Sequence, residues 1–410
     1  MPLAWAEFPL TLASPMMKRF APVAAAVLTL AVGCSSGSPR PSAAVSPPPA
    51  RPSATVTTGA PVAPPSPPGI GAVASSPSSR GRLRLVQTIR GDITPKSVVA
   101  SGRGLVFAQN MMYTHTVTVY DRRGRLVRTI RDDVALADFG FSQYAGRYRG
   151  APVEAAVTPD GRSAYVSNYS MYGPDLSHQG DDVCSPQLGI DNSFLYRIDT
   201  ASLRIDQVIS VGAVPKFVAV TPNGRLVLAT NWCSWSLTVI DAGTGRSIRE
   251  VALGRYPRGI AVDPMSRTAY VAVMGASRVA RVDLRTFRVS WLPAVGSGPR
   301  HLVTDASGRW LYVTLNGDGQ VAKVDLRTGR MVAKVRTGSQ PRSMAISADG
   351  LALYVVNYAS DTISKLRTSD MSVVQTVPVN HHPIGISYDA GTGDVWVACY
   401  SGSLMVFRDS

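Results

Sequence analysis

From residue 81 to its end, the chain alternates between short apolar runs and clusters of turn-forming residues. Residues 215–220 and 226–231 are two such runs, and the polar segment 221–225, Thr-Pro-Asn-Gly-Arg, separates them. The runs are rich in valine, leucine and aromatic side chains and are too short for stable helices, so they predict β-strands. Asparagine and glycine supply the geometry of tight turns. The pattern therefore predicts an all-β domain over residues 81–410.

The apolar runs recur with a fixed period of 42 residues. Five prolines stand at this spacing and each opens the same pattern: Pro215, Pro257, Pro299, Pro341 and Pro383. Thirteen residues after each proline a large apolar or aromatic side chain begins a second run: Leu228, Tyr270, Tyr312, Tyr354 and Trp396. Pro95 and Pro152 open the same pattern, and the intervals of 57 and 63 residues that follow them indicate insertions. Seven repeats are therefore expected.

Four short strands in each repeat are typical of a propeller blade. The sequence thus predicts a seven-bladed β-propeller of four-stranded antiparallel blades. The last repeat, from Pro383 to Ser410, has room for only three strands. Residues 86–89, Val-Gln-Thr-Ile, match Val-Gln-Thr-Val at 374–377, so we expect an N-terminal strand to complete the last blade. Such pairing would close the ring and remove an open sheet edge.

Several of the runs resemble the YVTN family of propeller repeats. The matching segments are 165–168 (YVSN), 312–316 (YVTLN) and 354–357 (YVVN), and the repeats cover 82–410. The resemblance implies an extracytoplasmic binding or surface protein. Propellers host binding modules, lactonases, lyases and quinoprotein enzymes alike, so the fold alone does not choose among these functions.

The first eighty residues do not follow the repeat. Lys18 and Arg19 precede an uncharged apolar stretch that ends at Cys34, which resembles a bacterial lipoprotein signal. That family usually has leucine three residues before the cysteine, where this chain has Ala31. We expect a signal over 16–34 with lipidation of Cys34, or otherwise an ordinary secretory signal. Residues 1–15 are then a mis-assigned start or an extension.

A proline-rich segment links this signal to the repeats. Residues 35–80 contain twelve prolines and no acidic or aromatic residue. A segment of this composition cannot bury enough apolar surface to fold, and its prolines keep it extended. We expect a disordered tether that holds the propeller outside the cytoplasm, anchored to the membrane through Cys34 or, without lipidation, secreted.

The chain is basic as well as apolar. Its 45% hydrophobic content is enough for a packed core and excludes a wholly disordered chain. The net charge is +15, and residues 81–410 alone contain 37 lysines and arginines against 26 aspartates and glutamates. This balance favours anionic partners.

The residue that follows each repeat-opening proline is basic in five of the seven repeats. The seven residues are Lys96, Val153, Lys216, Arg258, Arg300, Arg342 and Ile384. Propeller pseudo-symmetry would bring them round one end of the channel, on the face that also receives the insertions at 132–150 and 171–192. Like charges held together repel unless an anion or acidic neighbours neutralise them. The five basic residues therefore form an anion-binding ring or pair with aspartates of neighbouring blades.

Aromatic residues are expected on the same face. They lie at or just beyond the ends of the second strands: Tyr169, Trp232, Trp235, Tyr358 and Tyr400. Exposed aromatic rings beside arginine can stack on bases or sugars. In the alternative, they pack between the blades. No nucleic-acid recognition motif accompanies them.

Cysteines provide one predicted crosslink. Cys184 in the second insertion and Cys233 in the corresponding loop of the next blade are placed to form a disulfide in an oxidising compartment. Cys399 takes the position of Asn168 or Asn231 in other repeats, so it is read as a buried thiol. No spacing of cysteine and histidine favours a metal site, and we predict neither a metal nor a cofactor.

Candidates for catalysis are few. Glu154 and His301 each stand two residues after their proline, and they are weak candidates for an acid and a base. We therefore predict a monomeric binding protein for an anionic polymer, such as a wall polymer, a polysaccharide or a nucleic acid, or for a surface protein. The alternatives are a hydrolase or lyase of the lactonase type and a structural scaffold.

Overall fold

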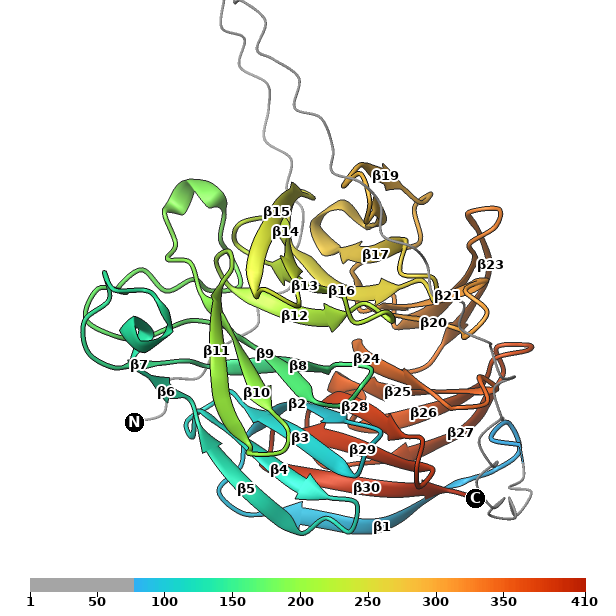
Figure 1. The fold of residues 1–410 in the computed structure, drawn as a ribbon. Coiled ribbons are helices and arrows are strands. Elements are labelled where there is room, and N and C mark those ends of the chain that lie inside the picture. The colour runs from blue at the N-terminus through green and yellow to red at the C-terminus, as the bar shows by residue number, and fades with distance from the viewer. Residues whose placement is uncertain (1–76) are drawn as a thin grey trace, which may run out of the picture. The chain divides into compact units, whose positions relative to one another are not determined.

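The computed structural model describes residues 77–410, which form seven four-stranded antiparallel sheets around a common centre (Figure 1). This confirms the predicted seven-bladed propeller. Residues 1–76, with Cys34 and nearly all of the proline-rich tether, lie outside the described residues, so the signal, the lipidation and the tether stay predictions. Within the described range, none of the helices has the length and apolar character needed to span a bilayer.

The innermost strand of every blade begins at one of the seven prolines, because proline is accepted at the first residue of a strand. The innermost strands are β2 (Pro95–Ala100), β8 (Pro152–Val157), β12 (Pro215–Val220), β16 (Pro257–Val262), β20 (Pro299–Thr304), β24 (Pro341–Ile346) and β28 (Pro383–Asp389). The second strands are β3 (Leu105–Asn110), β9 (Ser163–Asn168), β13 (Leu226–Asn231), β17 (Thr268–Val273), β21 (Trp310–Leu315), β25 (Ala352–Asn357) and β29 (Asp394–Cys399).

The two remaining strands of each blade lie farther from the centre (Figure 1). The third strands are β4 (Thr116–Asp121), β10 (Phe194–Asp199), β14 (Ser236–Asp241), β18 (Arg278–Asp283), β22 (Gln320–Asp325), β26 (Thr362–Arg367) and β30 (Ser403–Asp409). The outermost strands are β5 (Leu126–Arg131), β11 (Arg204–Ser210), β15 (Arg246–Ala252), β19 (Val289–Trp291), β23 (Arg330–Arg336), β27 (Val373–Pro378) and β1 (Leu83–Arg90).

The ring closes as predicted, because β1 pairs with β30 and supplies the outer strand of the last blade. A buried charged pair reinforces this closure from the neighbouring blade. The Nζ of Lys365 donates to the carboxylate of Asp409 at 2.5 Å and to the carbonyl oxygen of Gly81 at 2.6 Å. The hydroxyl of Tyr354 donates to the other oxygen of Asp409 at 2.5 Å. Both ends of the propeller chain are thereby tied to β25 and β26.

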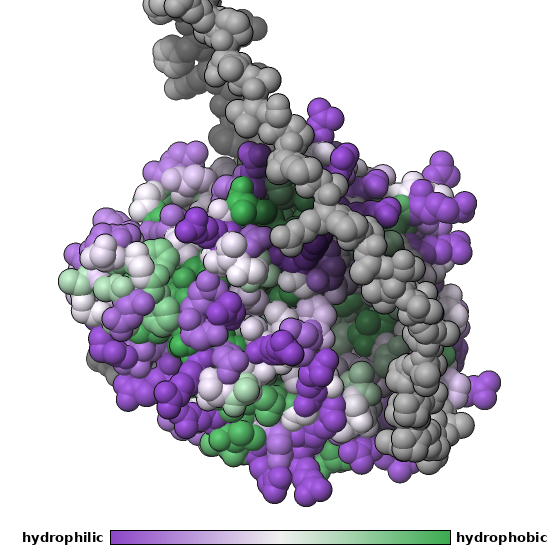
Figure 2. Space-filling view, viewed as in Figure 1, coloured by the Kyte–Doolittle hydropathy of each residue, from purple (hydrophilic) through white to green (hydrophobic). Residues whose placement is uncertain are grey.

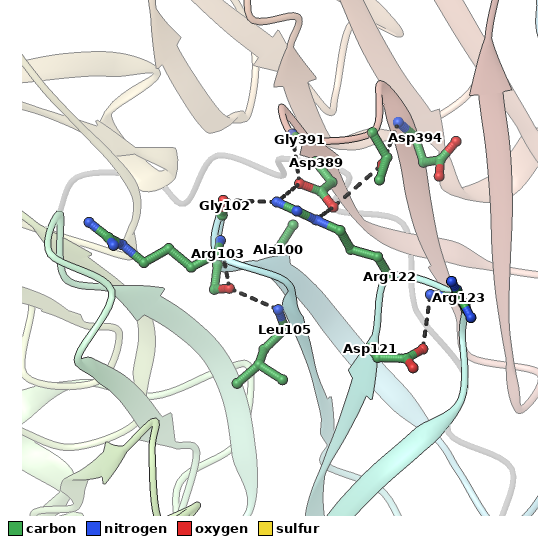
Figure 3. Close-up of polar contacts among 12 residues, drawn as sticks. Ala100, Gly102, Arg103, Leu105, Asp121, Arg122, Arg123, Asp389, Gly391 and Asp394 are labelled. Atoms are coloured by element: carbon green, nitrogen blue, oxygen red, sulfur yellow. Dashed lines mark hydrogen bonds and ion pairs between the residues drawn. The ribbon is translucent and has the colours of Figure 1, made fainter. Parts of the chain in front are cut away.

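A second polar contact joins the first blade to the last, as Figure 3 shows. The Nε of Arg122 donates to Oδ2 of Asp389 at 2.9 Å, and its Nη2 donates to the carbonyl oxygen of Gly102 at 2.9 Å. Asp389 is buried, so its carboxylate depends on these protein donors. The contact holds the turn after β4 against the turn after β28.

The hydrophobic core lies between adjacent blades. One cluster combines Leu237 and Val251 of the third blade with Ile260, Val271 and Val282 of the fourth. A single repeat cannot bury its apolar faces alone, and stacking against both neighbours buries them. On the face in Figure 2, hydrophilic residues are spread over the propeller, and the hydrophobic patches are small and separate.

A buried side chain at the end of the second strand recurs and explains part of the repeat pattern. The Nδ2 of Asn110, Asn231 and Asn357 donates to hydroxyls at the start of the third strand. Each asparagine thus ties two strands together where the chain turns. Cys399 takes this place in the last blade and is a buried free thiol.

The two insertions lie where the repeat spacing put them. The first carries β6 (Asp133–Val134), the 3₁₀-helix η1 (Leu136–Phe139) and β7 (Tyr148–Arg149). Its Tyr148 packs in a cluster with Phe194 of β10. The second insertion carries η2 (Pro186–Leu188). Two further 3₁₀-helices follow second strands: η3 (Met274–Ala276) and η4 (Tyr358–Ser360).

Candidate functional site: a cationic cluster at the axial mouth

The five predicted basic residues occupy one structural position, directly after the first residue of an innermost strand. In all seven blades the pairing with the second strand shifts register at this position, which is the mark of a β-bulge. A bulge leaves a residue outside the regular ladder and re-aims its side chain. The structure therefore presents these side chains together at one end of the channel. We call them the axial cluster: Lys96, Lys216, Arg258, Arg300 and Arg342.

Mutual repulsion shows that the side chains of the axial cluster lie near one another. Burial lowers the pKa of Lys96 well below its usual value, and the charges of Arg258 and Arg300 lower it further. Burial also lowers the pKa of Arg300, with added repulsion from Arg258 and Arg342. Lys96, Lys216 and Arg258 are each less than 9% exposed. Three members of the cluster are thus buried, and Arg300 and Arg342 are partly exposed.

Two carboxylates face this positive charge. The Nζ of Lys216 donates to Oδ1 of Asp182 at 2.6 Å, and Lys216 holds the pKa of that carboxyl below its usual range. Burial raises the pKa of Glu154 to about 7, against the opposing charge of Lys96. Within residues 77–410, neither Arg258 nor Arg300 has an ion-pair partner within 4.0 Å. Pairing with a neighbouring aspartate is therefore realised at Lys216 and does not extend to these two arginines.

The second insertion delivers Asp182 to the cluster. Cys184 forms a disulfide with Cys233, and their Cα atoms are 5.2 Å apart. The Nε1 of Trp232 donates to the carbonyl oxygen of Asp182 at 3.2 Å. Sequence reasoning did not assign Asp182 to this ring. Its position two residues before the predicted bridging cysteine was the available signal.

Four of the five predicted aromatic residues lie beside cations of the cluster. The Nζ of Lys216 is 4.2 Å from the ring centroid of Tyr169 and 5.0 Å from that of Trp232. The guanidinium carbon of Arg342 is 3.5 Å from the ring centroid of Tyr358, and the Nζ of Lys96 is 5.9 Å from that of Tyr400. These distances fall within the usual range of cation–π contacts.

The fifth aromatic residue, Trp235, is placed differently. It precedes β14 in a left-handed backbone conformation (φ 56°), and the cation near its ring is Arg255 at 5.8 Å. His115, Ser277 and Asp361 have positive φ at the same point of their blades. The position of Trp235 thus follows from the turn into the third strand.

Glu154 and His301 are not joined as an acid and base. The backbone N–H of Met344 donates to Nδ1 of His301 at 3.2 Å, so the neutral ring carries its proton on Nε2. Burial and the charges of Arg258 and Arg300 lower the pKa of His301 to about 3. No hydrogen bond links the two residues in the described part of the chain. His301 therefore remains neutral at physiological pH.

Comparisons with known proteins bear on the fold. A model of the cytochrome D1 heme domain matches residues 300–385, well under half of the chain. Among solved structures, the chain is similar to hydrazine synthase of Kuenenia stuttgartiensis, with 19% sequence identity and a TM-score of 0.62. That match covers 78% of this chain and 97% of the solved chain. No curated protein matches the chain.

A haem needs an axial ligand, for which proteins commonly use a histidine nitrogen. The histidine beside the axial cluster does not fit this role, because Nδ1 of His301 accepts a backbone hydrogen bond and Nε2 holds the proton. In the same segment, the side chain of His381 is 63% exposed and its ring stacks on that of His382 at a centroid distance of 3.6 Å, so it does not lie in an enclosed haem pocket. We therefore derive no chemistry through a haem. Together, the structure and the comparisons identify the chain as a β-propeller, similar in part to the cytochrome D1 heme domain.

Proposed function

We propose that the propeller is an extracytoplasmic, lipid-anchored binding protein whose axial mouth receives an anionic group of a polymer or of a surface protein. The observation that carries this proposal is the excess of basic groups in the axial cluster, where Arg258 and Arg300 repel one another and have no ion pair within residues 77–410. Buried charges of one sign are costly, and an entering anion relieves that cost.

The depth of the cluster limits the shape of the ligand. Lys96, Lys216 and Arg258 are nearly buried, so an extended polymer lying across the face would not reach them. A narrow group, such as a phosphate, sulfate or carboxylate at a chain end or on a side branch, is the better match. The partly exposed ring of Tyr169 at the same mouth can pack against the sugar or base that carries the group.

Three features support the proposed location. The Cys184–Cys233 disulfide is typical of proteins in oxidising compartments. The segment before Cys34 resembles a lipoprotein signal, and the repeats resemble the YVTN family of extracytoplasmic proteins. A lipid on Cys34 followed by a long tether would keep the axial mouth within reach of wall or surface polymers.

The proposal is tested by binding to heparin and to polyphosphate over a range of salt concentrations. We expect the change of Arg258, Arg300 and Arg342 to alanine to lower affinity at least about tenfold, because a hydrogen bond to a charged group contributes about 1.5–3 kcal/mol. The salt dependence of binding should become shallower as cationic contacts are lost.

A matched control uses three exposed arginines of outer strands, Arg246, Arg249 and Arg330, changed to alanine in the same way. This variant removes the same formal charge and should keep most of the affinity. Equal losses in both variants would mean that binding follows net charge, and unchanged binding in the axial variant would refute an axial site. A scaffold without a ligand predicts no binding to either polymer.

One observation favours a second function, a hydrolase or lyase of the lactonase type. Glu154 has a pKa of about 7 beside Lys96, which suits a group that accepts and returns a proton near neutral pH. His301 does not serve as its partner, so this reading depends on Glu154 alone. Turnover of a lactone panel by the native chain, lost in Glu154→Gln, would support it. Absence of turnover in the native chain would reject it.

A further inference from the structure

The first blade carries a polar cavity away from the axial cluster, and none of the axial cluster residues line it. The cavity has a volume of about 480 Å³ and lies where the end of β5, the turn before β4 and the first insertion meet. Its lining residues are Thr114, His115, Thr116, Arg131, Asp132, Asp133, Arg147 and Arg149. We call it the rim cavity.

His115 is held in one orientation at the rim cavity. Its Nδ1 donates to the carbonyl oxygen of Gly150 at 2.6 Å, and Oδ2 of Asp132 lies 4.0 Å from the same nitrogen. The neutral ring therefore has its lone pair on Nε2. The side chain is 20% exposed and lines the cavity. Because one ring nitrogen is bound to the main chain, Nε2 is the nitrogen left for a ligand.

The charges around His115 favour an anion. Arg131 and Arg147 share the carboxylate of Asp133, at 3.4 and 3.0 Å. Arg149 is exposed and has no ion pair within 4.0 Å among residues 77–410. Asp132 is 3% exposed, its Oδ2 has no hydrogen-bond partner, and burial raises its pKa to about 8. Three arginines thus face one carboxylate that is ionised at neutral pH.

A neighbouring cavity of about 630 Å³ shares part of its lining with the rim cavity. The two share Thr114 and Thr116 as lining residues, and Thr129 also lines the neighbouring cavity. Tyr113 also lines it and is 83% exposed. An exposed aromatic ring beside several hydroxyls suits the flat face and the hydroxyl groups of a sugar. The rim cavity therefore suits an anionic group, and the neighbouring cavity suits a sugar ring.

We propose that the rim cavity and the neighbouring cavity form one binding site for a sugar that carries a carboxylate or a phosphate. The charged group lies against the guanidinium of Arg149, and the lone pair on Nε2 of His115 accepts a hydrogen bond from a hydroxyl of the sugar. The sugar packs over Tyr113 and the threonine hydroxyls. The site is separate from the proposed axial function, and either could exist without the other.

Calorimetric titration of the propeller with glucuronate, glucose 6-phosphate, glucose and inorganic phosphate tests the proposal. Binding of at least one of the two acidic sugars is expected, with glucose much weaker, and the stronger acidic sugar identifies the charged group. Arg149→Ala should weaken the acidic sugar at least about tenfold, because it removes a charge-assisted hydrogen bond. Tyr113→Ala should weaken the acidic sugar and leave inorganic phosphate unchanged.

Two control variants separate this site from others. Arg128→Ala removes an exposed arginine of β5 that lines neither cavity, and this variant should bind as the native chain does. The triple axial variant at Arg258, Arg300 and Arg342 should also keep acidic-sugar binding. The proposal is overturned if neither acidic sugar binds, if Arg149→Ala binds normally, or if binding is lost in the axial variant instead.

Discussion

Two groups of charged side chains in this propeller differ in whether the protein neutralises them. At the ring closure, Lys365 is fully buried, and its charge is matched by the carboxylate of Asp409 and the carbonyl oxygen of Gly81. At the axial mouth, Arg258 and Arg300 are deeply placed without an ion pair among the described residues. One group is balanced by the protein itself, and the other has an excess of positive charge.

The difference separates structure from function. A balanced buried pair specifies which strands meet, and breaking it leaves a charge without a partner. An excess of like charge stabilises no contact in the empty protein, because its members repel one another. The closure pair therefore serves the fold, and the axial cluster is where we propose that an anion binds.

Replacement of one charge in each group should give the largest contrast. Lys365→Met leaves Asp409 buried without its cation, and we expect a loss of about 3–5 kcal/mol in the free energy of unfolding. Arg300→Leu removes a repelling charge and should change that free energy by less than about 1 kcal/mol, or raise it. Urea unfolding measures both. Equal losses would show that the axial charges also serve the fold.

The disulfide should have the next largest effect, because it holds the insertion that supplies Asp182. Its cysteines are separated by 49 residues in sequence, and we expect Cys184→Ser with Cys233→Ser to cost about 2–4 kcal/mol of unfolding free energy. Tryptophan emission should also change, since the bond from Trp232 to Asp182 depends on the insertion. Chemical reduction of the native chain should reproduce both changes. Unaltered stability and emission would mean that packing alone holds the insertion.

The smallest effect is a pH dependence of anion binding. Burial lowers the pKa of Lys216 to about 7, with Asp182 opposing the shift and Arg258 and Arg300 adding to it. Lys216 therefore loses its charge as the pH rises through 7, while Glu154, with a pKa of about 7, gains one. Both changes weaken anion binding, and affinity should fall between about pH 6 and 8.

Stability should move in the opposite direction. The unfolded chain holds a proton on Lys216 up to its ordinary pKa near 10.5, and the folded chain releases it near 7. Between these values the unfolded state binds more protons, so this group makes the folded state more stable as the pH rises. Lys216→Arg keeps the charge over this range and should reduce both dependences. An unchanged pH profile of anion binding in Lys216→Arg would assign that titration to Glu154.

The repeat explains why so much of the fold could be predicted. Five prolines spaced by 42 residues, with Pro95 and Pro152 set apart by insertions, predicted the number of blades and the start of every innermost strand, since proline is tolerated there and in few other places in a sheet. The match between residues 86–89 and 374–377 gave the closing strand. Side chains copied from one template had to reach equivalent positions, so the common end of the basic residues also followed.

The charge balance of the site could not be predicted in the same way. The bulge after each proline, which aims the basic side chains, is a property of strand pairing rather than of residue type. Asp182 comes from an insertion outside the repeat, and Trp235 pairs with Arg255. The rim cavity is lined by both His115 and Arg149, which the first insertion brings together, and no spacing in the sequence predicts this arrangement.

The sequence by itself determined the repeating unit, because strand and turn preferences are local and the same preferences recur in every repeat. Tertiary structure decided which charges are compensated, because the pKa of a buried group depends on neighbours that the chain brings in from distant segments. Lys365 and Lys216 look alike in the sequence. Because of their surroundings, Lys365 forms an ion pair that holds two blades together, whereas Lys216 is a member of the axial cluster whose pKa is lowered to about 7.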